Sequence, residues 1–298
     1  MAHDELNDGR HREGRRSFLK KVGVGAAVAW TAPTIASTRA LAQATCGISD
    51  PTDIPGLFAW YDGADPTTIN PPSNPNTDVP VQEWWDKSGN ARHLEQLTLA
   101  NQPLWRFNTG INGLGSVEFF GNEFLDWMAA DPGFAALTSA TVFYVARNDV
   151  SPDGPVLWGY DSSAGNSITA WQIGGADVTS NLGGTETFTI ASNGNATGTD
   201  ATNYTLGTDL VTVTQSTTVS TLRVNLTPRT LNLGNPAQDL TPSVASGGNA
   251  DMLRVGANDL TTQAFFDGQI GEIIIYNSVL TAAEIDAIEC YLNLKWFV

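Results

Sequence analysis

The stretch from residue 265 to residue 296 constrains the fold most, because it joins an apolar strand to a capped helix. Residues 269–276 are rich in β-branched side chains, which predicts a strand buried on both faces and therefore covered by protein on each side. Successive side chains of a strand point to opposite faces. This period assigns Ile270, Ile274 and Tyr276 to one face and Ile273 and Ile275 to the other.

A single helix is predicted after this strand. Thr281 is the expected N-cap, and Glu284 three residues later completes a capping box. Leu280 and Ile285 have the spacing of a hydrophobic staple around the first turn. Apolar residues then repeat at helical spacing and predict one buried stripe, formed by Ile285, Ile288, Leu292 and Trp296.

Short strands separated by turn residues account for most of the remaining chain. Many such strands with Gly, Pro and Asn turns, and one helix, predict an all-β fold, an antiparallel β-sandwich or jelly roll. Residues 183–207 leave two interpretations open, a loop or a pair of weakly patterned outer strands. Strands are predicted within residues 54–61, 81–85, 104–107, 116–120, 141–146, 156–160, 170–173, 210–214, 220–226 and 254–256, and a loop over 69–80.

The first 44 residues are predicted to be a cleaved export signal. An apolar run over residues 22–36 is shorter than the roughly 20 residues that span a membrane, so membrane insertion is not expected. Small residues follow, and cleavage is expected at Ala42 or Ala44. An uncleaved basic tail is the alternative. The segment before the apolar run resembles the twin-arginine export motif at Arg15, Arg16, Phe18 and Leu19.

This signal predicts the compartment and the charge of the mature protein. We expect the twin-arginine translocon as a partner during export, and a periplasmic, cell-surface or secreted location. Residues 1–44 hold seven Lys and Arg and four Asp and Glu, so residues 45–298 carry 8 bases and 27 acids, a net charge of −19. Such a surface disfavours nucleic acid and anionic lipid as partners, and is compatible with neutral or cationic glycans and with cations.

Two cysteines remain after the predicted cleavage, Cys46 near the new N-terminus and Cys290 in the predicted helix. An oxidising compartment favours a disulfide between them, which would close nearly the whole domain. Two buried free thiols are the alternative.

A further pattern is spread over six segments, residues 60–65, 84–94, 102–103, 111–121, 141–147 and 267–296. Together these segments resemble the laminin-G-like domains of the concanavalin A-like lectin/glucanase superfamily. The likeness is specific at the W-x-D-x-S-G-N turn of residues 84–90 and at the terminal strand and helix, and vague between residues 151 and 253. It implies one β-sandwich domain over residues 45–298. It also implies an extracellular glycan-binding or adhesive module, often with a structural Ca²⁺, although some relatives are hydrolases or lyases.

Residues 284–289, E-I-D-A-I-E, also match a signature of the laminarinase-like retaining glucanases. In those enzymes the signature lies on a strand, whose period of two brings the acids to one face. Here the same letters follow a helix cap, and on a helix Glu284 and Asp286 point roughly 200° apart. We therefore predict a structural role for these acids.

Catalysis by histidine or zinc has little support, because His93 is the only histidine after residue 44. Calcium fits better, since it binds several oxygen ligands in loops rich in Asp and Asn. The same residue types also form ordinary turn hydrogen bonds, which is the alternative interpretation. The candidate calcium ligands are Asp62, Asp65, Asp86 and Asn90.

Sugar binding requires exposed aromatic rings that stack on pyranose rings. Trp60, Trp84 and Trp296 are expected in the core. Trp85 is the first candidate, because it follows Trp84 on a strand and so faces outward if Trp84 faces inward. The other candidates are Trp105, Trp127, Trp158 and Trp171, and for each of them core packing is the alternative.

These observations predict an exported, non-catalytic carbohydrate-binding or adhesive module. One alternative is a glycan hydrolase or lyase on the same fold, which needs two carboxylates or a Tyr/His pair in one groove. The other is a structural surface protein that assembles through its sheet edges, with residues 205–230 as the contact surface.

Overall fold

The computed structural model describes residues 46–70, 77–127, 137, 139–149, 156–160, 169–173, 188–192, 195–200, 207–216, 220–229, 231–232, 252–257 and 265–298. The chain divides into two units, Met1–Thr38 and Arg39–Val298, and all described residues belong to the second. The predicted export motif (Arg15, Arg16, Phe18, Leu19) and cleavage sites (Ala42, Ala44) lie outside the described residues and stay predictions.

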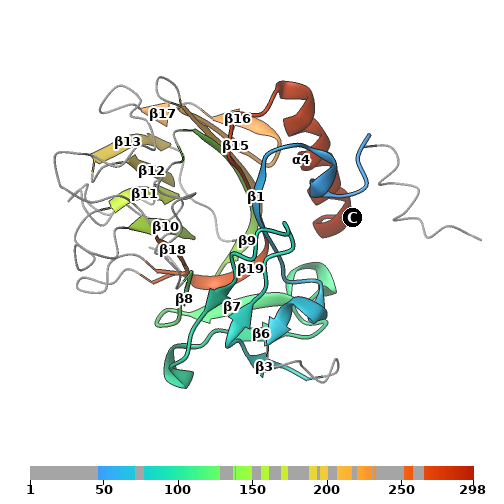
Figure 1. The fold of residues 1–298 in the computed structure, drawn as a ribbon, viewed down its shortest axis with the longest axis vertical. Coiled ribbons are helices and arrows are strands. Elements are labelled where there is room, and N and C mark those ends of the chain that lie inside the picture. Colours follow the sequence, from blue (N-terminus) through green and yellow to red (C-terminus); the bar gives the residue numbers. More distant parts are fainter. Residues whose placement is uncertain are drawn as a thin grey trace, which may run out of the picture. The chain divides into compact units, whose positions relative to one another are not determined.

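Two antiparallel sheets form the second unit (Figure 1). The nine-stranded sheet A runs in the order β16-β15-β14-β9-β19-β7-β6-β3, with β1 also paired to β19. Its strands are β1 (Leu57–Asp62), β3 (Val79–Pro80), β6 (Leu104–Arg106), β7 (Ser116–Phe120), β9 (Ala140–Asn148), β14 (Gly207–Gln215), β15 (Ser220–Val224), β16 (Thr227–Arg229) and β19 (Asp267–Tyr276).

The ten-stranded sheet B runs in the order β17-β13-β12-β11-β10-β18-β8-β5-β4-β2. Its strands are β2 (Ile69–Asn70), β4 (Glu83–Trp84), β5 (Leu94–Glu95), β8 (Leu125–Asp126), β10 (Leu157–Tyr160), β11 (Thr169–Ile173), β12 (Phe188–Ser192), β13 (Asn195–Asp200), β17 (Leu231–Asn232) and β18 (Met252–Val255). The helices are α4 (Ala282–Trp296) and the 3₁₀ turns η1 (Pro51–Asp53), η2 (Pro66–Thr68), η3 (Leu99–Asn101) and η4 (Ile111–Gly113).

This architecture confirms the predicted all-β sandwich with a C-terminal helix. Within residues 183–207, β12 and β13 pair with each other, which confirms the outer-strand interpretation for the described part of that segment. The segment 69–80, predicted as a loop, contains the two-residue strands β2 and β3 at its ends. Strands of two residues are too short to show a hydrophobic period, so the sequence pattern did not reveal them.

The central strand β19 of sheet A is buried on both faces, as the β-branched run predicted. Figure 1 shows α4 on one side of β9 and β19, and β10 to β13 of sheet B on the other. The core between the sheets includes Trp84, Tyr144 and Ile273. The second core, between sheet A and α4, includes Ile274 and Trp296. The buried helical stripe of Ile285, Ile288, Leu292 and Trp296 is confirmed.

One part of the strand prediction is wrong, because a β-bulge at Gly271 shifts the register of β19. Ile270 lies in the core between the sheets with Ile273 and Ile275, and not on the face of Ile274. The bulge adds one residue to β19 that has no partner of its own on β9. The alternation of side chains between the two faces of β19 is therefore shifted by one residue across the bulge. Gly271 is required, since an added Cβ would lie 2.9 Å from the ring of Trp296.

The capping box of α4 is confirmed, and it gives the acids of residues 284–289 structural roles. The Glu284 carboxylate accepts the Thr281 amide at 2.8 Å. Asp286 and Glu289 both bind Arg223, at 3.3 and 2.8 Å. These contacts confirm the helical interpretation over the glucanase signature. Neither α4 nor any shorter described helix has the length and hydropathy of a membrane span.

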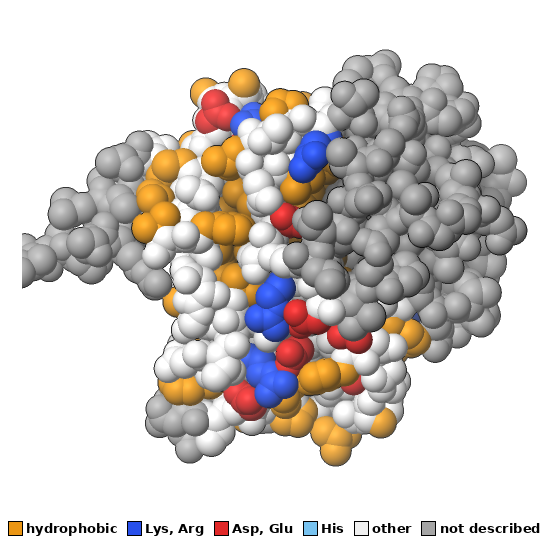
Figure 2. Space-filling view, turned by 180° about the vertical axis from the view of Figure 1, so that it is seen from behind, with side chains coloured by type: hydrophobic (Ala, Val, Ile, Leu, Met, Phe, Trp, Pro, Cys, Tyr) orange, Lys and Arg blue, Asp and Glu red, His pale blue; other side chains and the backbone are white. Residues whose placement is uncertain are grey.

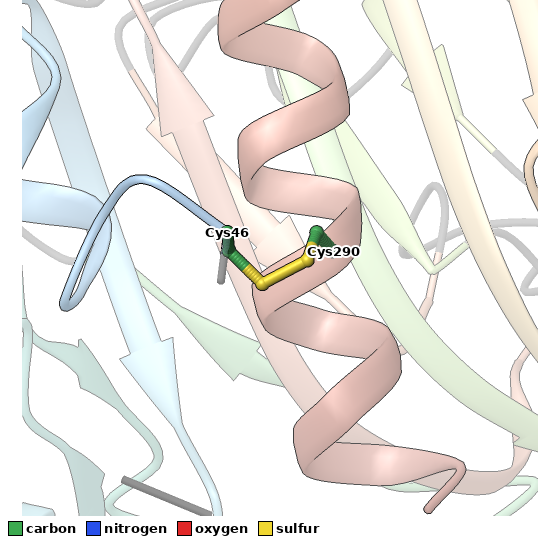
Figure 3. The surroundings of a disulfide bond; sticks show 2 residues. All are labelled: Cys46 and Cys290. Atoms are coloured by element: carbon green, nitrogen blue, oxygen red, sulfur yellow. A yellow bond between two sulfur atoms is a disulfide. The ribbon is translucent and has the colours of Figure 1, made fainter. Parts of the chain in front are cut away.

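The predicted disulfide joins Cys46 to Cys290, which are 244 residues apart in sequence, with 5.5 Å between their Cα atoms (Figure 3). A hydrogen bond supports the same attachment, because the Tyr276 hydroxyl donates to the Pro51 carbonyl at 2.7 Å. The segment that precedes β1 is thereby fixed to both α4 and β19.

Removing this disulfide should destabilise the domain strongly. In the chain-entropy model, opening a loop of this length costs about 5 kcal/mol, because the unfolded chain regains its freedom. The double variant Cys46→Ser, Cys290→Ser should therefore show a free energy of unfolding lower by about that amount in urea titrations. A loss below about 1 kcal/mol would contradict a stabilising role for the disulfide.

Candidate functional site

A tight turn after β4 builds the floor of the candidate site. The Asp86 carboxylate accepts the backbone amides of Trp60 at 2.9 Å, Ser88 at 2.8 Å and Arg92 at 3.0 Å. The Asn90 side-chain amide donates to the Phe58 carbonyl at 3.0 Å. Together these bonds hold the turn against β1, so the residues within it have fixed positions.

Trp85 projects outward from this rigid turn, as predicted. Its side chain is 41% exposed, whereas Trp84 is fully buried between the sheets. The Trp85 amide donates to the Thr68 carbonyl at 2.7 Å, and its indole nitrogen donates to Glu83 at 3.0 Å. The His93 ring lies beside it, with 6.1 Å between ring centroids. The backbone hydrogen bond, the indole hydrogen bond to Glu83 and the neighbouring His93 ring together fix the orientation of the exposed indole face.

A groove of about 690 Å³ opens beside this indole, which we call the Trp85 groove. His93 Nδ1 accepts the Asp86 amide at 3.0 Å, so the neutral ring carries its proton on Nε2. Hydroxyl, carboxylate and ammonium groups surround the aromatic face, which is the combination that sugar recognition needs. The lining residues are Asp65, Thr67, Thr68, Trp85, Asp86, Lys87 and His93.

Lys87 stands between two carboxylates at one end of this groove. Its Nζ lies 2.8 Å from Asp65 Oδ2 and 3.0 Å from Asp62 Oδ2, and 4.4 Å above the Trp60 ring. Burial lowers the pKa of Lys87, but the two carboxylates outweigh it and raise the pKa above the ordinary value. For Asp65, burial raises the pKa, while the bonds from Lys87 and Thr67 bring it below its usual range.

A second cavity of about 350 Å³, the Lys295 pocket, also has Lys87 in its wall. Below it lies Glu272, which is fully buried. The pocket is lined by Ser49, Asp50, Trp60, Asp62, Lys87, Tyr291, Leu294 and Lys295.

Glu272 is satisfied by four donors from two other elements. Its carboxylate accepts the indole nitrogens of Trp60 at 2.7 Å and Trp296 at 2.8 Å, the Tyr291 hydroxyl at 3.1 Å and the Lys295 ammonium at 2.7 Å. Burial raises the pKa of Glu272, and the Lys295 charge partly opposes this. The sequence analysis missed this network, although an acid within an apolar run buried on both faces was a signal for it.

The remaining tryptophan candidates do not join the site. Trp127 is 4% exposed and packs edge-on against Phe58, which agrees with the core-packing alternative. Trp105 is buried too, and its indole nitrogen donates to the Gly63 carbonyl at 2.8 Å. Trp158 and Trp171 lie on β10 and β11, but their side chains are outside the described residues.

The four predicted calcium ligands lie close to one another, but in this structure they bind protein groups. Asp62 and Asp65 hold Lys87, Asp86 holds backbone amides, and Asn90 donates to backbone carbonyls. An ammonium group thus occupies the position between the carboxylates that a cation would take. Across the described ranges, no cluster of three or more His, Cys, Asp or Glu could hold a metal ion. Binding of a structural Ca²⁺ stays a prediction.

A second polar region lies on the face of sheet A that α4 covers only in part. Seen from behind, basic and acidic side chains alternate over the lower half of the surface, at the level of β3, β6 and β7 (Figure 2). On this face, Arg106 binds both Asp78 and Glu118, and Gln269 donates to Glu118 at 3.2 Å. Phe120 beside them is 48% exposed.

Comparison with protein-family models and with curated proteins finds no match for this chain. Among solved structures, a Trypanosoma rangeli sialidase in complex with 2,3-difluorosialic acid matches with a TM-score of 0.52 and 13% identity, over 80% of this chain and 33% of that chain. An arabinofuranosidase complexed with arabinofuranosyl-α-1,2-xylobiose matches with a TM-score of 0.50 and 12% identity, over 74% of this chain and 52% of that chain.

This chain therefore spans about a third of the sialidase and about half of the arabinofuranosidase. At this level of identity the likeness shows a shared fold alone. The finer assignment to the laminin-G-like domains stays a prediction.

Buried titratable groups predict a loss of stability at alkaline pH. Burial, followed by the charges of Glu272 and Asp62, raises the pKa of Tyr291, and burial likewise raises the pKa of Tyr61. Burial lowers the pKa of Lys295, but the charges of Glu272 and Asp62 outweigh this effect, so the pKa lies above its ordinary value. A group whose pKa is higher in the folded state than in the unfolded state stabilises the folded protein at pH values below the unfolded-state pKa, which is about 10 for Tyr and Lys. This stabilisation is lost as the pH rises from the unfolded-state pKa towards the folded-state pKa.

The free energy of unfolding should therefore fall between pH 8 and pH 11, and fall less in Tyr291→Phe, which lacks one of these groups. Urea titrations of both proteins at the two pH values measure this. Equal stability of the parent at both values would contradict the prediction.

Proposed function

We propose that residues 45–298 form an exported, non-catalytic carbohydrate-binding module that contacts its glycan in the Trp85 groove. The observation that carries this proposal is the fixed, exposed indole of Trp85 above a groove lined by polar groups. Stacking of a sugar ring on such a face buries apolar C–H groups, while the neighbouring hydroxyls and charges bind sugar hydroxyls. The carbohydrate-active proteins that share the fold are consistent with this class of ligand.

Binding is favoured over catalysis in this groove because its titratable groups already have internal partners. Asp86 accepts backbone amides, Asp65 binds Lys87, and His93 Nδ1 accepts the Asp86 amide. A general acid or base must exchange a proton with the substrate, and these bonds hold the groups in other roles.

The twin-arginine motif supports export as part of the proposal, and the disulfide fits an oxidising compartment. The alternative of assembly through sheet edges has less support. β14 lies inside sheet A, and the sheet ends in the short strands β16 and β3, which contain Pro228 and Pro80. Short edge strands with proline resist pairing with another chain.

Replacing Trp85 should weaken glycan binding without affecting the fold. Trp85→Ala removes the stacking face, so the affinity for glycans retained by the parent on an array of neutral and charged glycans should fall about tenfold or more. Leu99→Ala, which removes a more exposed apolar side chain outside the groove, is the matched control. Unchanged binding by Trp85→Ala, or a parent that retains no glycan, would refute the proposal.

Glycoside hydrolysis is the second candidate function, and one observation favours it. Register pairs Asp267 with Phe120 and Gln269 with Glu118, so Asp267 and Glu118 are diagonal neighbours on one face of sheet A. The backbone positions of diagonal neighbours are about 7–8 Å apart, so the two carboxyl groups can reach the separation of about 6.5–9.5 Å that inverting glycosidases use. Burial, with the charges of Asp149 and Glu118, raises the pKa of Asp267, as a general acid requires.

If this pair is catalytic, Asp267→Asn and Glu118→Gln should each abolish release of reducing sugar from polysaccharides, and the parent should give the inverted anomer by NMR. Glu284→Gln changes a carboxylate that caps α4, so it should retain full activity. Hydrolysis that persists in Asp267→Asn would exclude this pair.

A further inference from the structure

The Trp85 groove and the Lys295 pocket share one wall. Lys87 lines both cavities, and its ammonium binds Asp65 on the groove side and Asp62 on the pocket side. The Lys87 amide also donates to the Trp60 carbonyl at 2.7 Å, which fixes this wall to β1. A single side chain thus separates an exposed indole from a neighbouring cavity. Both volumes, about 690 and 350 Å³, fall in the range of small-molecule sites.

The Lys295 pocket has walls from opposite ends of the chain. Ser49 and Asp50 come from the segment after Cys46, while Tyr291, Leu294 and Lys295 come from the α4 turn that begins at Cys290. The disulfide joins these two segments through Cys46 and Cys290. Asp50 also caps η1 by accepting the Thr52 amide at 2.8 Å, so this wall has a defined conformation. The pocket is therefore preorganised by covalent and hydrogen bonds.

From this arrangement we propose that the two cavities are adjoining subsites for one neutral oligosaccharide of at least two sugar units. Trp85 stacks on one unit, and the next unit enters the Lys295 pocket past Lys87. This inference rests on the proposed function and extends it, because it defines the length and charge of the ligand.

The charges around the two cavities select a neutral ligand. The walls contain four carboxylates, Asp50, Asp62, Asp65 and Asp86, and two ammonium groups, Lys87 and Lys295. The Lys295 ammonium is bound by Asp62 and Glu272, at 2.6 and 2.7 Å, so it cannot receive a sugar carboxylate without losing them. An anionic sugar is repelled by the excess of carboxylates, whereas a neutral sugar leaves the ion pairs of Lys87 and Lys295 intact.

Isothermal titration of the full exported domain with oligosaccharide series tests this inference. The probes are β-1,4-linked oligomers of glucose and of N-acetylglucosamine, which are neutral, and of galacturonic acid, which are anionic, each from one to six units. Leu294→Trp fills the Lys295 pocket, and Leu97→Trp, at an exposed residue that lines neither cavity, is the matched control. Asp50→Asn keeps a capping side chain but removes one carboxylate.

The affinity of the parent for a neutral series should rise about tenfold between one unit and three. Leu294→Trp should lose this increase and keep the affinity for one unit, Leu97→Trp should behave as the parent, and Trp85→Ala should lose affinity at every length. Asp50→Asn should bind galacturonic acid oligomers more tightly than the parent does. An affinity independent of length, an unaffected Leu294→Trp, or a preference of the parent for galacturonic acid would overturn this inference alone. A parent that binds no oligomer would overturn the proposed function with it.

Discussion

The position of β1 and α4 on sheet A depends on one buried carboxylate. Glu272 is a charge without access to water, and such a charge is tolerated only when every oxygen is paired. Its donors come from β1 through Trp60 and from α4 through Tyr291, Lys295 and Trp296. Losing any donor leaves the charge undersatisfied, so the two elements are held in one arrangement. Lys295 then extends this network outward to Asp62 and the wall of the candidate site.

The same turn that closes this part of the sandwich also presents the candidate ligand contact. Asp86 gathers backbone amides from the turn and from β1, and the neighbouring Trp84 fills the core. Trp85 gains its exposure and its fixed orientation from these two neighbours. A platform ordered in advance loses little conformational freedom on binding, which suits recognition of weakly contacting ligands such as sugars. The stability of the sandwich and the proposed recognition of a sugar therefore depend on the same short segment.

Local sequence patterns predicted what local physics determines. The cap at Thr281 and the outward direction of Trp85 follow from residues a few positions apart, and both are confirmed. The bulge at Gly271 escaped prediction, because one extra residue changes the face of Ile270 without changing composition. Lys87 and its partners escaped as well, since ion pairs across the fold join residues whose proximity only the topology creates. No residue next to Trp127 in the sequence indicated which way its side chain points, so the sequence could not decide whether Trp127 is buried or exposed.

The bond between Cys46 and Cys290 has a mechanical consequence. Tension applied to the chain at these two residues passes through the sulfur atoms, and it bypasses the whole loop between them. The hydrogen bonds that join β1, β9 and β19 bear none of this load, although they would be sheared in an open chain. Tension along the chain from the segment before Cys46 to the residues after Cys290 therefore leaves the sandwich, and with it the shape of the Trp85 groove, unloaded for as long as that covalent link is intact.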